Sequence, residues 1–322
     1  MKICIYGAGA IGGYIAVQLT TTGHDVSLVA RGPHLAAIEE RGLTLKIDGQ
    51  EKQANFEATD DPSMLGIQDY VLITLKAHSL PGIVPDLQPL LGPETTVVSA
   101  VNGIPWWYCY GLELGEHIEA VDPGGVIWNG VGPERALGCV VYPSAEIESP
   151  GVIRHISDNK FSIGEPSGEK SERATEFASI LIDAGFKAPV RPRLRDEIWI
   201  KLWGNLAFNP LSVLTGEDLQ TLATEKETRD FARQMMLEAQ AIGENVGARF
   251  AVDVDRRIAG AAAVGAHRTS MLQDFELGRP LEIGALVEVV QELGHMVQLP
   301  TPTIDKVHAQ LKQRIADRDR QH

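Results

Sequence analysis

Short apolar runs alternate with amphipathic segments along the first half of the chain. Four runs have the length and the Val, Ile and Leu content of strands buried on both faces of a parallel sheet; they lie at 1–6, 26–30, 70–75 and 97–101. Helical spacing of apolar residues follows the first run at 14–21 and recurs at 169–184. Strands that alternate with helices in this way predict an α/β domain of the Rossmann type.

A linker and a change of pattern separate this domain from the rest of the chain. Residues 189–193 combine proline with arginine, and beyond them the apolar spacing is helical as far as about residue 315. We therefore expect a Rossmann-type N-terminal domain at residues 1–189 and an all-α C-terminal domain at residues 190–322. The tail at 317–322 is expected to fray.

The remaining β signals are expected to extend the sheet of the first domain. Asp48-Gly49 separates the runs 43–47 and 53–56, which is the pattern of a hairpin. Further strands are expected at 137–142, 152–156 and 161–164, the first two of them antiparallel to each other.

A glycine-rich turn follows the first predicted strand at once. Its sequence, Gly7-Ala8-Gly9-Ala10-Ile11-Gly12, is a G-x-G-x-x-G motif with a strand before it and a helix after it, the context in which the motif is specific. Gly7 permits a tight turn, Gly9 lets the backbone approach a pyrophosphate, and Gly12 lets helix and strand pack closely. Because the N-terminus of the helix then faces the anion, the motif predicts a dinucleotide-binding site.

Arg31 stands at the end of the second predicted strand, where an NAD enzyme would carry an Asp or Glu for the ribose 2′-hydroxyl. Asp25 comes before that strand and is expected to be a turn residue. An arginine binds a 2′-phosphate in a forked, charge-assisted geometry. The predicted cofactor is therefore NADP(H), and a solvated surface arginine is the alternative.

Two polar residues follow the next strands at the same edge of the predicted sheet. Lys76 ends the run 70–75, and Asn102 follows the run 97–101. Ligands of open α/β sheets bind beyond the carboxyl ends of the strands, so both residues are expected to reach the cofactor. A helix is expected to open at Pro105, and the aromatic residues Trp106 and Trp107 that follow it either pack internally or line the substrate site.

A polar stripe marks the first helix of the second domain. Lys201, Asn205 and Asn209 recur at i, i+4 and i+8, opposite an apolar face formed by Trp199, Leu202, Trp203, Leu206 and Ala207. Pro210 lacks an N–H, so the helix should kink or end at Asn209 and leave backbone groups available to a ligand. A lysine and two carboxamides suit an oxygen-rich small molecule. An amphipathic helix with a Glu197–Lys201 ion pair is the alternative interpretation.

The stretch from Ser270 to Glu282 carries a second polar pattern in the helical domain. One helix is expected to end near Gly278 and another to restart at Pro280, with Glu282 in its first turn. The positive end of that helix favours an ionised carboxylate, and a capping role for Glu282 is the alternative.

Charge and composition exclude several classes of partner. The chain of 322 residues carries a net charge of −14, which repels nucleic acid and anionic membrane surfaces. No apolar run reaches membrane length and no signal peptide precedes the first strand, so a cytoplasmic protein is expected. Cys4, Cys109 and Cys139 form no ligand pattern, and we expect buried thiols and no metal site.

These motifs together resemble the ketopantoate reductase (2-dehydropantoate 2-reductase) family along nearly the whole chain. The match comprises Gly7-x-Gly9-x-x-Gly12, Arg31, Thr74-Leu75-Lys76, Asn102-Gly103, Lys201-x-x-x-Asn205-x-x-x-Asn209-Pro210, and Ser270-Met271-Leu272-Gln273-Asp274 with Glu282. The resemblance implies NADPH-dependent reduction of a 2-oxo acid, with ketopantoate the favoured substrate, in the cleft between two domains. A homodimer is compatible with it.

The resemblance also implies roles for several of these residues and for Ser144. Lys201 is the implied proton donor to the substrate carbonyl, and Glu282 is implied to orient substrate or cofactor. Substrate contacts are implied for Asn102, Asn205, Asn209 and Ser270. Cofactor contacts are implied for the glycine turn, Arg31, Lys76, Asn102 and Ser144, the last in the loop after the strand 138–142.

Two departures from the family pattern concern the substrate. A further substrate-binding asparagine, about ten residues beyond Asn209 in the members compared, is replaced by Glu217-Asp218-Leu219, and Trp106-Trp107 resembles a paralogous branch. The alternative functions are a β-hydroxyacid dehydrogenase acting on another small acid, and a non-catalytic NADP(H)-sensing protein.

Overall fold

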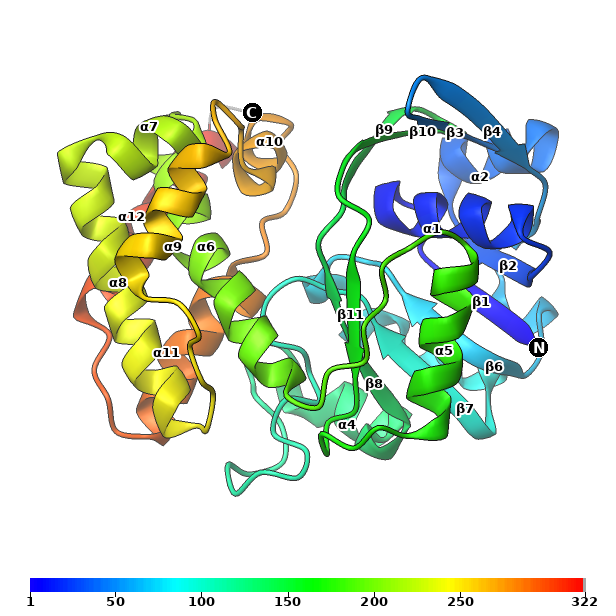
Figure 1. The fold of residues 1–322 in the computed structure, drawn as a ribbon, viewed down its shortest axis with the longest axis horizontal. Coiled ribbons are helices and arrows are strands. Elements are labelled where there is room, and N and C mark those ends of the chain that lie inside the picture. The colour runs from blue at the N-terminus through cyan, green and yellow to red at the C-terminus, as the bar shows by residue number, and fades with distance from the viewer. Residues whose placement is uncertain (321–322) are drawn as a thin grey trace. The chain divides into compact units, whose positions relative to one another are not determined.

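The computed structural model describes residues 1–320, which form two compact units (Figure 1). The first unit consists of Met1–Leu112 and Gly124–Leu194, and the second of Glu113–Pro123 with the chain from Arg195 onwards. The first is an α/β unit and the second is helical, so the predicted fold class is confirmed. The hydrophobic pattern did not reveal that Glu113–Pro123 belongs to the second unit.

Seven strands form the main sheet of the first unit, in the spatial order β11-β8-β7-β6-β1-β2-β5. They are β1 (Lys2–Tyr6), β2 (Asp25–Val29), β5 (Glu57–Thr59), β6 (Gln68–Ile73), β7 (Leu91–Ser99), β8 (Ala136–Val141) and β11 (Phe161–Gly164). All pairs are parallel except β11–β8. The parallel strands follow the 3-2-1-4-5-6 order of a dinucleotide-binding sheet, whose ligand crevice lies where the order reverses, here between β1 and β6.

Four strands form a separate sheet, which the sequence interpretation had placed on the main one. They are β3 (Leu43–Ile47), β4 (Gln50–Ala54), β9 (Ser144–Ser149) and β10 (Val152–Ser157), in the order β4-β3-β10-β9. The β3–β4 hairpin is confirmed, but the predicted pairing of β10 with β8 is wrong. Instead β10 pairs antiparallel with β9 and parallel with β3, and β9 was not predicted. Short alternating strands do not specify their partner, which explains the error.

Five α-helices accompany the two sheets: α1 (Ala10–Thr21), α2 (Gly32–Arg41), α3 (Val84–Leu87), α4 (Val126–Val131) and α5 (Glu172–Asp183). Helix α1 contacts strands of both sheets (Figure 1). A β-carbon at Gly13 would come within 2.8 Å of Ile153, so the absence of a side chain lets the second sheet approach the helix. The second sheet therefore covers the helix that begins at the glycine turn.

The aromatic segment after Asn102 forms turns, so the helix predicted to open at Pro105 is wrong. Trp106 and Trp107 are each only 1% exposed. The indole N–H of Trp106 donates to the Ser99 hydroxyl at 3.0 Å. Within the first unit, Trp106 is thus bonded to the last residue of β7.

The second unit is built from helices α6 (Leu194–Thr215), α7 (Leu219–Thr224), α8 (Lys226–Asn245), α9 (Val254–Ala263), α10 (Ser270–Glu276), α11 (Val289–Met296) and α12 (Pro302–Asp319), with a π-helical turn, Gly284–Glu288, before α11. Helix α12 extends through the start of the tail expected to fray, and residues 321 and 322 lie outside the described part. No helix within residues 1–320 combines the length and apolarity needed to cross a membrane.

Helix α6 continues past Pro210 to Thr215, so of the two expected outcomes, a kink or an end at Asn209, the end is wrong. A proline inside a helix costs about 3 kcal/mol, because one hydrogen bond is lost and the ring meets a carbonyl. The buried residues on both sides, among them Leu206, Phe208 and Leu211, offset that cost, since each apolar side chain contributes about 1.5–3 kcal/mol on burial.

An ion pair between a half-buried arginine and a buried carboxylate attaches α5 to the main sheet. Arg173 donates from Nε and Nη2 to the two carboxylate oxygens of Glu165, both at 2.7 Å, and Glu165 is 6% exposed. The same guanidinium donates to the carbonyl oxygens of Glu134 and Ala136 beside β8. The hydrogen bonds to Glu165 raise the pKa of Arg173, which keeps its guanidinium charged.

Replacing this arginine should destabilise the first unit. Arg173→Met keeps much of the apolar stem but leaves the Glu165 carboxylate buried and unpaired, a change that costs about 3 kcal/mol. Urea unfolding followed by circular dichroism should show a clearly lower midpoint. Arg154→Met, which removes an exposed pair with Glu146, is the control and should shift the midpoint little. Equal shifts for the two variants would contradict the structural role of the buried pair.

Candidate functional site

The predicted glycine motif forms a tight turn between β1 and α1. Gly7 has φ +109°, a conformation that favours glycine, and its N–H and that of Ala8 donate to the Val29 carbonyl oxygen at 3.0 and 3.3 Å. A β-carbon at Gly12 would overlap the carbonyl oxygen of Gly7, whereas one at Gly9 would meet no protein atom within 4 Å. The turn therefore needs glycine at its ends, and space remains open at its centre.

The N-terminus of α1 is suited to an anion. Gly9 is its N-cap residue, no side chain caps the helix, and its first turn contains no acidic residue. The N–H groups of Ala10, Ile11 and Gly12 therefore point out of the helix end, which is also the positive end of the helix dipole. Open space and outward N–H groups are what a pyrophosphate requires, so the turn fits the dinucleotide that its sequence predicted.

Two side chains hold this turn, and sequence reasoning assigned a role to neither of them. Thr74, just after β6, donates from Oγ1 to the Gly7 carbonyl oxygen at 2.5 Å. His34, in the first turn of α2, lies 2.7 Å from the Ala8 carbonyl oxygen through Nε2. Both belong to segments distant in sequence from the turn, so their contacts become visible only in the fold.

Arg31 is the exposed N-cap residue of α2 and follows β2 by two residues. Asp25 is the first residue of β2 and not a turn residue, a small correction to the expected boundary. Near Arg31, burial raises the pKa of Tyr6 to about 12, with the Asp86 carboxylate adding to the effect and Arg31 opposing it. The Tyr6 phenol is therefore neutral, and Arg31 is the cation at this strand end.

The other residues predicted to contact the cofactor differ in their positions. Lys76 and Asn102 are half-buried and follow the neighbouring parallel strands β6 and β7, so both lie at the edge of the sheet where the glycine turn lies. Ser144 is half-buried but is the first residue of β9, opposite Ser157 of the second sheet, and not a loop residue as expected.

The polar stripe of the second unit lies on α6 as predicted from its spacing. Lys201 and Asn205 are half-buried, and Asn209 is 6% exposed. The five residues of the predicted apolar face are all buried. The stripe is thus a row of polar groups on the border of an apolar core, which restricts their motion.

A hydrogen-bonded chain brings Ser270 toward this stripe within the second unit. The Ser212 hydroxyl donates to the Asn209 carbonyl oxygen at 2.7 Å and lies 2.6 Å from the Thr269 hydroxyl. Thr269 is the N-cap of α10 and accepts from the Leu272 N–H at 3.2 Å. Ser270 is the first residue of α10 and is exposed. The last turns of α6 and the N-terminus of α10 are therefore joined, a connection that the sequence did not reveal.

Glu282 is 6% exposed and lies directly before the helical segment that starts at Ile283. The expected restart of a helix at Pro280, with Glu282 in its first turn, is therefore wrong. A π-helical turn follows, a feature frequent at functional sites. A β-carbon at Gly284 would come 2.5 Å from the Ala120 carbonyl oxygen, and Glu292 accepts from the Ala120 N–H at 2.8 Å. The segment Glu113–Pro123, which belongs to the second unit, is thus held beside the π-helical turn.

Arg257 lies against α6 at Gly204, another contact that sequence reasoning missed. A β-carbon at Gly204 would be 2.5 Å from Nη2 of Arg257, and Nε of Arg257 donates to the Ile200 carbonyl oxygen at 3.4 Å. A glycine inside a helix costs about 1 kcal/mol relative to alanine. Here it admits a second cationic side chain within one turn of Lys201.

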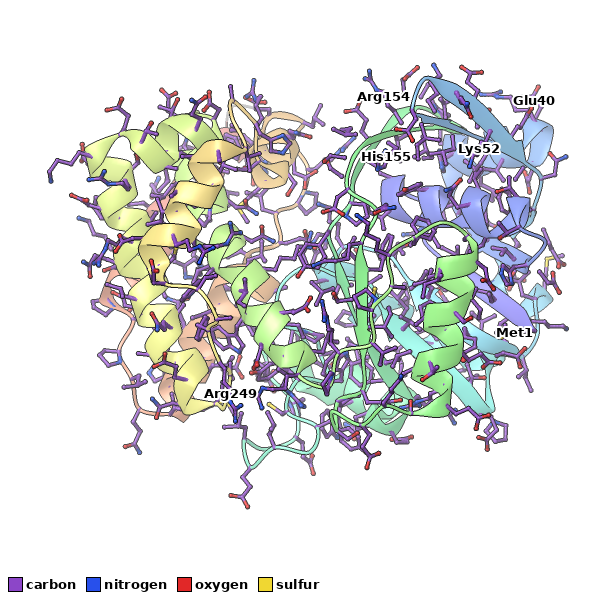
Figure 2. The ribbon with its side chains drawn as sticks, in the orientation of Figure 1. Met1, Glu40, Lys52, Arg154, His155 and Arg249 are labelled. Atoms are coloured by element: carbon purple, nitrogen blue, oxygen red, sulfur yellow. The ribbon has the colours of Figure 1, made fainter. Side chains whose placement is uncertain are left out.

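An open groove of about 850 Å³ lies elsewhere in the first unit. Tyr14 and Gln18 on α1, Lys52 on β4 and His155 on β10 line part of it. Figure 2 labels the side chains of Lys52 and His155. The Lys52 ammonium donates to Gln18 at 2.7 Å, and the His155 ring lies 4.8 Å from that of Tyr14. Tyr14 and Gln18 lie about one and two turns beyond the start of α1, so the groove is distinct from the anion site at the helix N-terminus.

Family models of known proteins match most of the chain. The family model described as ketopantoate reductase PanE/ApbA matches residues 3–168, and the model of its C-terminal domain matches residues 193–315. A protein of Mesorhizobium japonicum named 2-dehydropantoate 2-reductase is 55% identical over 322 residues, covering 99% of each chain. These matches cover both units.

Solved structures show the same architecture. A candidate ketopantoate reductase from Ralstonia solanacearum MolK2 is 38% identical with a TM-score of 0.95, covering 99% of this chain and 98% of that one. D-mandelate dehydrogenase, solved with NADH and anilino(oxo)acetate, is 22% identical with a TM-score of 0.84 over 99% of each chain, a likeness of fold. The chain belongs to the ketopantoate reductase family of oxidoreductases.

Proposed function

We propose that this protein reduces a 2-oxo acid to the 2-hydroxy acid with NADPH, and that its substrate is ketopantoate. The observation that carries the proposal is the half-buried lysine of α6 in one row with two carboxamides, in a chain whose other unit presents an uncapped glycine turn. The 55% identical relative named 2-dehydropantoate 2-reductase supports the choice of substrate.

The cofactor assignment depends on Arg31. The turn at Gly7–Gly12 would hold the pyrophosphate, and Lys76, Asn102 and Ser144 are the further residues assigned to the cofactor. Arg31 supplies a forked cation where an NAD enzyme would carry a carboxylate, and a 2′-phosphate suits it. When bound, the dinucleotide supplies the hydride. Because a protein of related fold was solved with NADH, the affinities for NADPH and NADH have to be compared directly.

The proposed chemistry assigns the proton to Lys201. Negative charge develops on the carbonyl oxygen as its carbon is reduced, and an ammonium within hydrogen-bond reach stabilises that charge and supplies the proton. Asn205, Asn209 and Ser270 would donate hydrogen bonds to the substrate oxygens. Glu282, being buried, would orient the substrate or the cofactor by accepting hydrogen bonds.

One observation favours a second candidate, a different 2-oxo acid. At the position of the further family asparagine, the chain begins α7, whose N-cap Asp218 accepts from the Thr221 N–H at 2.9 Å. That carboxylate holds its own helix and supplies no amide donor. NADPH oxidation measured against a panel of 2-oxo acids that includes ketopantoate decides between the candidates, and reduction of none of them would overturn the proposed function.

Arg31 should determine the preference for NADPH. Calorimetric titration should show NADPH binding much more tightly than NADH, because only the former carries a phosphate for the guanidinium. Arg31→Ala should remove most of that difference and leave NADH affinity nearly unchanged. Arg154→Ala, the loss of an exposed arginine on β10, is the control for the change in net charge. Equal affinities for the two cofactors in the parent protein would contradict the NADP assignment.

Lys201 should control turnover. Lys201→Ala should lower the rate of reduction by roughly 10² or more, the usual contribution of a general acid. NADPH affinity should barely change, and the thermal melt should shift slightly, because the side chain lies at the border of the core. Lys226→Ala, which removes an exposed lysine paired with Asp230, is the matched control. Turnover within a few fold of the parent would assign Lys201 to the structural ion-pair alternative.

A further inference from the structure

Both ring nitrogens of His34 are engaged in hydrogen bonds with the backbone of other segments. Nε2 lies 2.7 Å from the Ala8 carbonyl oxygen, and the Gly151 N–H donates to Nδ1 at 3.1 Å. A carbonyl oxygen only accepts and an N–H only donates, so Nε2 carries the proton and Nδ1 does not. Burial lowers the pKa of His34, which agrees with this neutral form.

The contact with Ala8 determines the direction of an N–H in the glycine turn. In a trans peptide the C=O and the following N–H point in opposite directions. Holding the Ala8 carbonyl toward α2 therefore directs the Gly9 N–H away from α2. A β-carbon at Gly9 would meet no protein atom within 4 Å, so there is open space beside this residue. Within residues 1–320 the Gly9 N–H meets no acceptor.

The other groups of the turn are held independently of His34. Thr74 holds the Gly7 carbonyl oxygen, and the Gly7 and Ala8 N–H groups donate to Val29. The peptide between Ala8 and Gly9 can rotate easily, because Gly9 has no side chain to restrict its φ. The hydrogen bond from His34 to the Ala8 carbonyl oxygen restrains this peptide, which Gly9 alone does not.

We propose that His34 is a positioning residue for the cofactor: it holds the Ala8–Gly9 peptide so that the Gly9 N–H is directed at the pyrophosphate of the bound dinucleotide. This inference rests on the dinucleotide binding of the proposed function and is independent of the substrate. The second contact has a different task, since Gly151 belongs to the turn between β9 and β10, which Arg41 also binds through the Pro150 carbonyl oxygen at 2.9 Å. One side of the ring acts on the cofactor site and the other on the second sheet.

Two amide variants separate these tasks. The amide N–H of glutamine reaches the place of Nε2, so His34→Gln retains a donor for Ala8. The amide oxygen of the shorter asparagine reaches the place of Nδ1, so His34→Asn retains an acceptor for Gly151 and loses the contact with Ala8. His34→Asn should raise the Kd for NADPH about tenfold, which is the size of effect expected from the loss of one hydrogen bond. His34→Gln should stay within about threefold of the parent.

Two fragments of the cofactor make the effect specific. Affinities of the full-length variants are measured by calorimetry, or by competition, for 2′-phospho-ADP-ribose, which contains the pyrophosphate, and for adenosine 2′-phosphate, which lacks it. His34→Asn should weaken the first and leave the second unchanged, and an unchanged second affinity also shows that the variant is folded. Arg31→Ala, by contrast, should weaken both fragments, because both carry the 2′-phosphate.

The outcomes separate this inference from the proposed reaction. Equal losses for both fragments, or equal losses in His34→Gln and His34→Asn, would assign His34 a structural role and overturn the inference. A parent protein that binds dinucleotide but reduces no 2-oxo acid would overturn the proposed reaction, while His34 would still be judged by the ratio of fragment affinities. A parent protein that binds no dinucleotide would overturn both.

Discussion

The close approach of the Gly7 carbonyl oxygen to the α-carbon of Gly12 is the contact on which the first unit depends. No side chain fits between them, so α1 begins directly at the carboxyl end of β1. The same helix carries Gly13, whose missing side chain admits Ile153 of the second sheet. Two adjacent glycines therefore place α1 against the main sheet on one side and the second sheet on the other. The open N–H groups of the turn follow from its sequence, since the N-cap residue Gly9 has no side chain that could cap them.

The second unit meets a different constraint, which is to keep polar groups on a helix that is otherwise buried. Asn209 is nearly inaccessible, and the proline that follows it removes a hydrogen bond from the helix. The Ser212 hydroxyl bonds to the Asn209 carbonyl oxygen and to Thr269, so the polar groups near the proline are satisfied by one another. Helix α6 passes through Pro210 without ending because the burial of its apolar neighbours offsets the lost hydrogen bond to the Leu206 carbonyl oxygen.

The fold and much of the candidate site could be predicted wherever the signal was local in sequence. The strand, the glycine motif and the helix after it are adjacent along the chain, and the spacing of Lys201, Asn205 and Asn209 is a property of one helix. The second sheet was misplaced because β10 pairs with β3, which lies more than a hundred residues earlier, and no pattern within either strand names the partner. His34, Thr74 and Arg257 were missed for the same reason. Each of these side chains contacts the backbone of a distant segment. A single histidine, threonine or arginine in the sequence does not indicate such a contact.

The two units hold their ligand-directed groups by different means, and this difference has a chemical reason. The first unit presents backbone N–H groups from a turn whose shape depends on glycines, so most side-chain changes leave the donors in place. A pyrophosphate is the same in every dinucleotide, and a backbone site suits an invariant group. The second unit presents side chains on helices, and each can be exchanged without moving the helix. The departure at Glu217-Asp218-Leu219 and the arginine beside Gly204 both lie in this unit. Under the proposed function, a substrate donor on these helices can therefore be replaced without remaking the turn that is proposed to bind the cofactor.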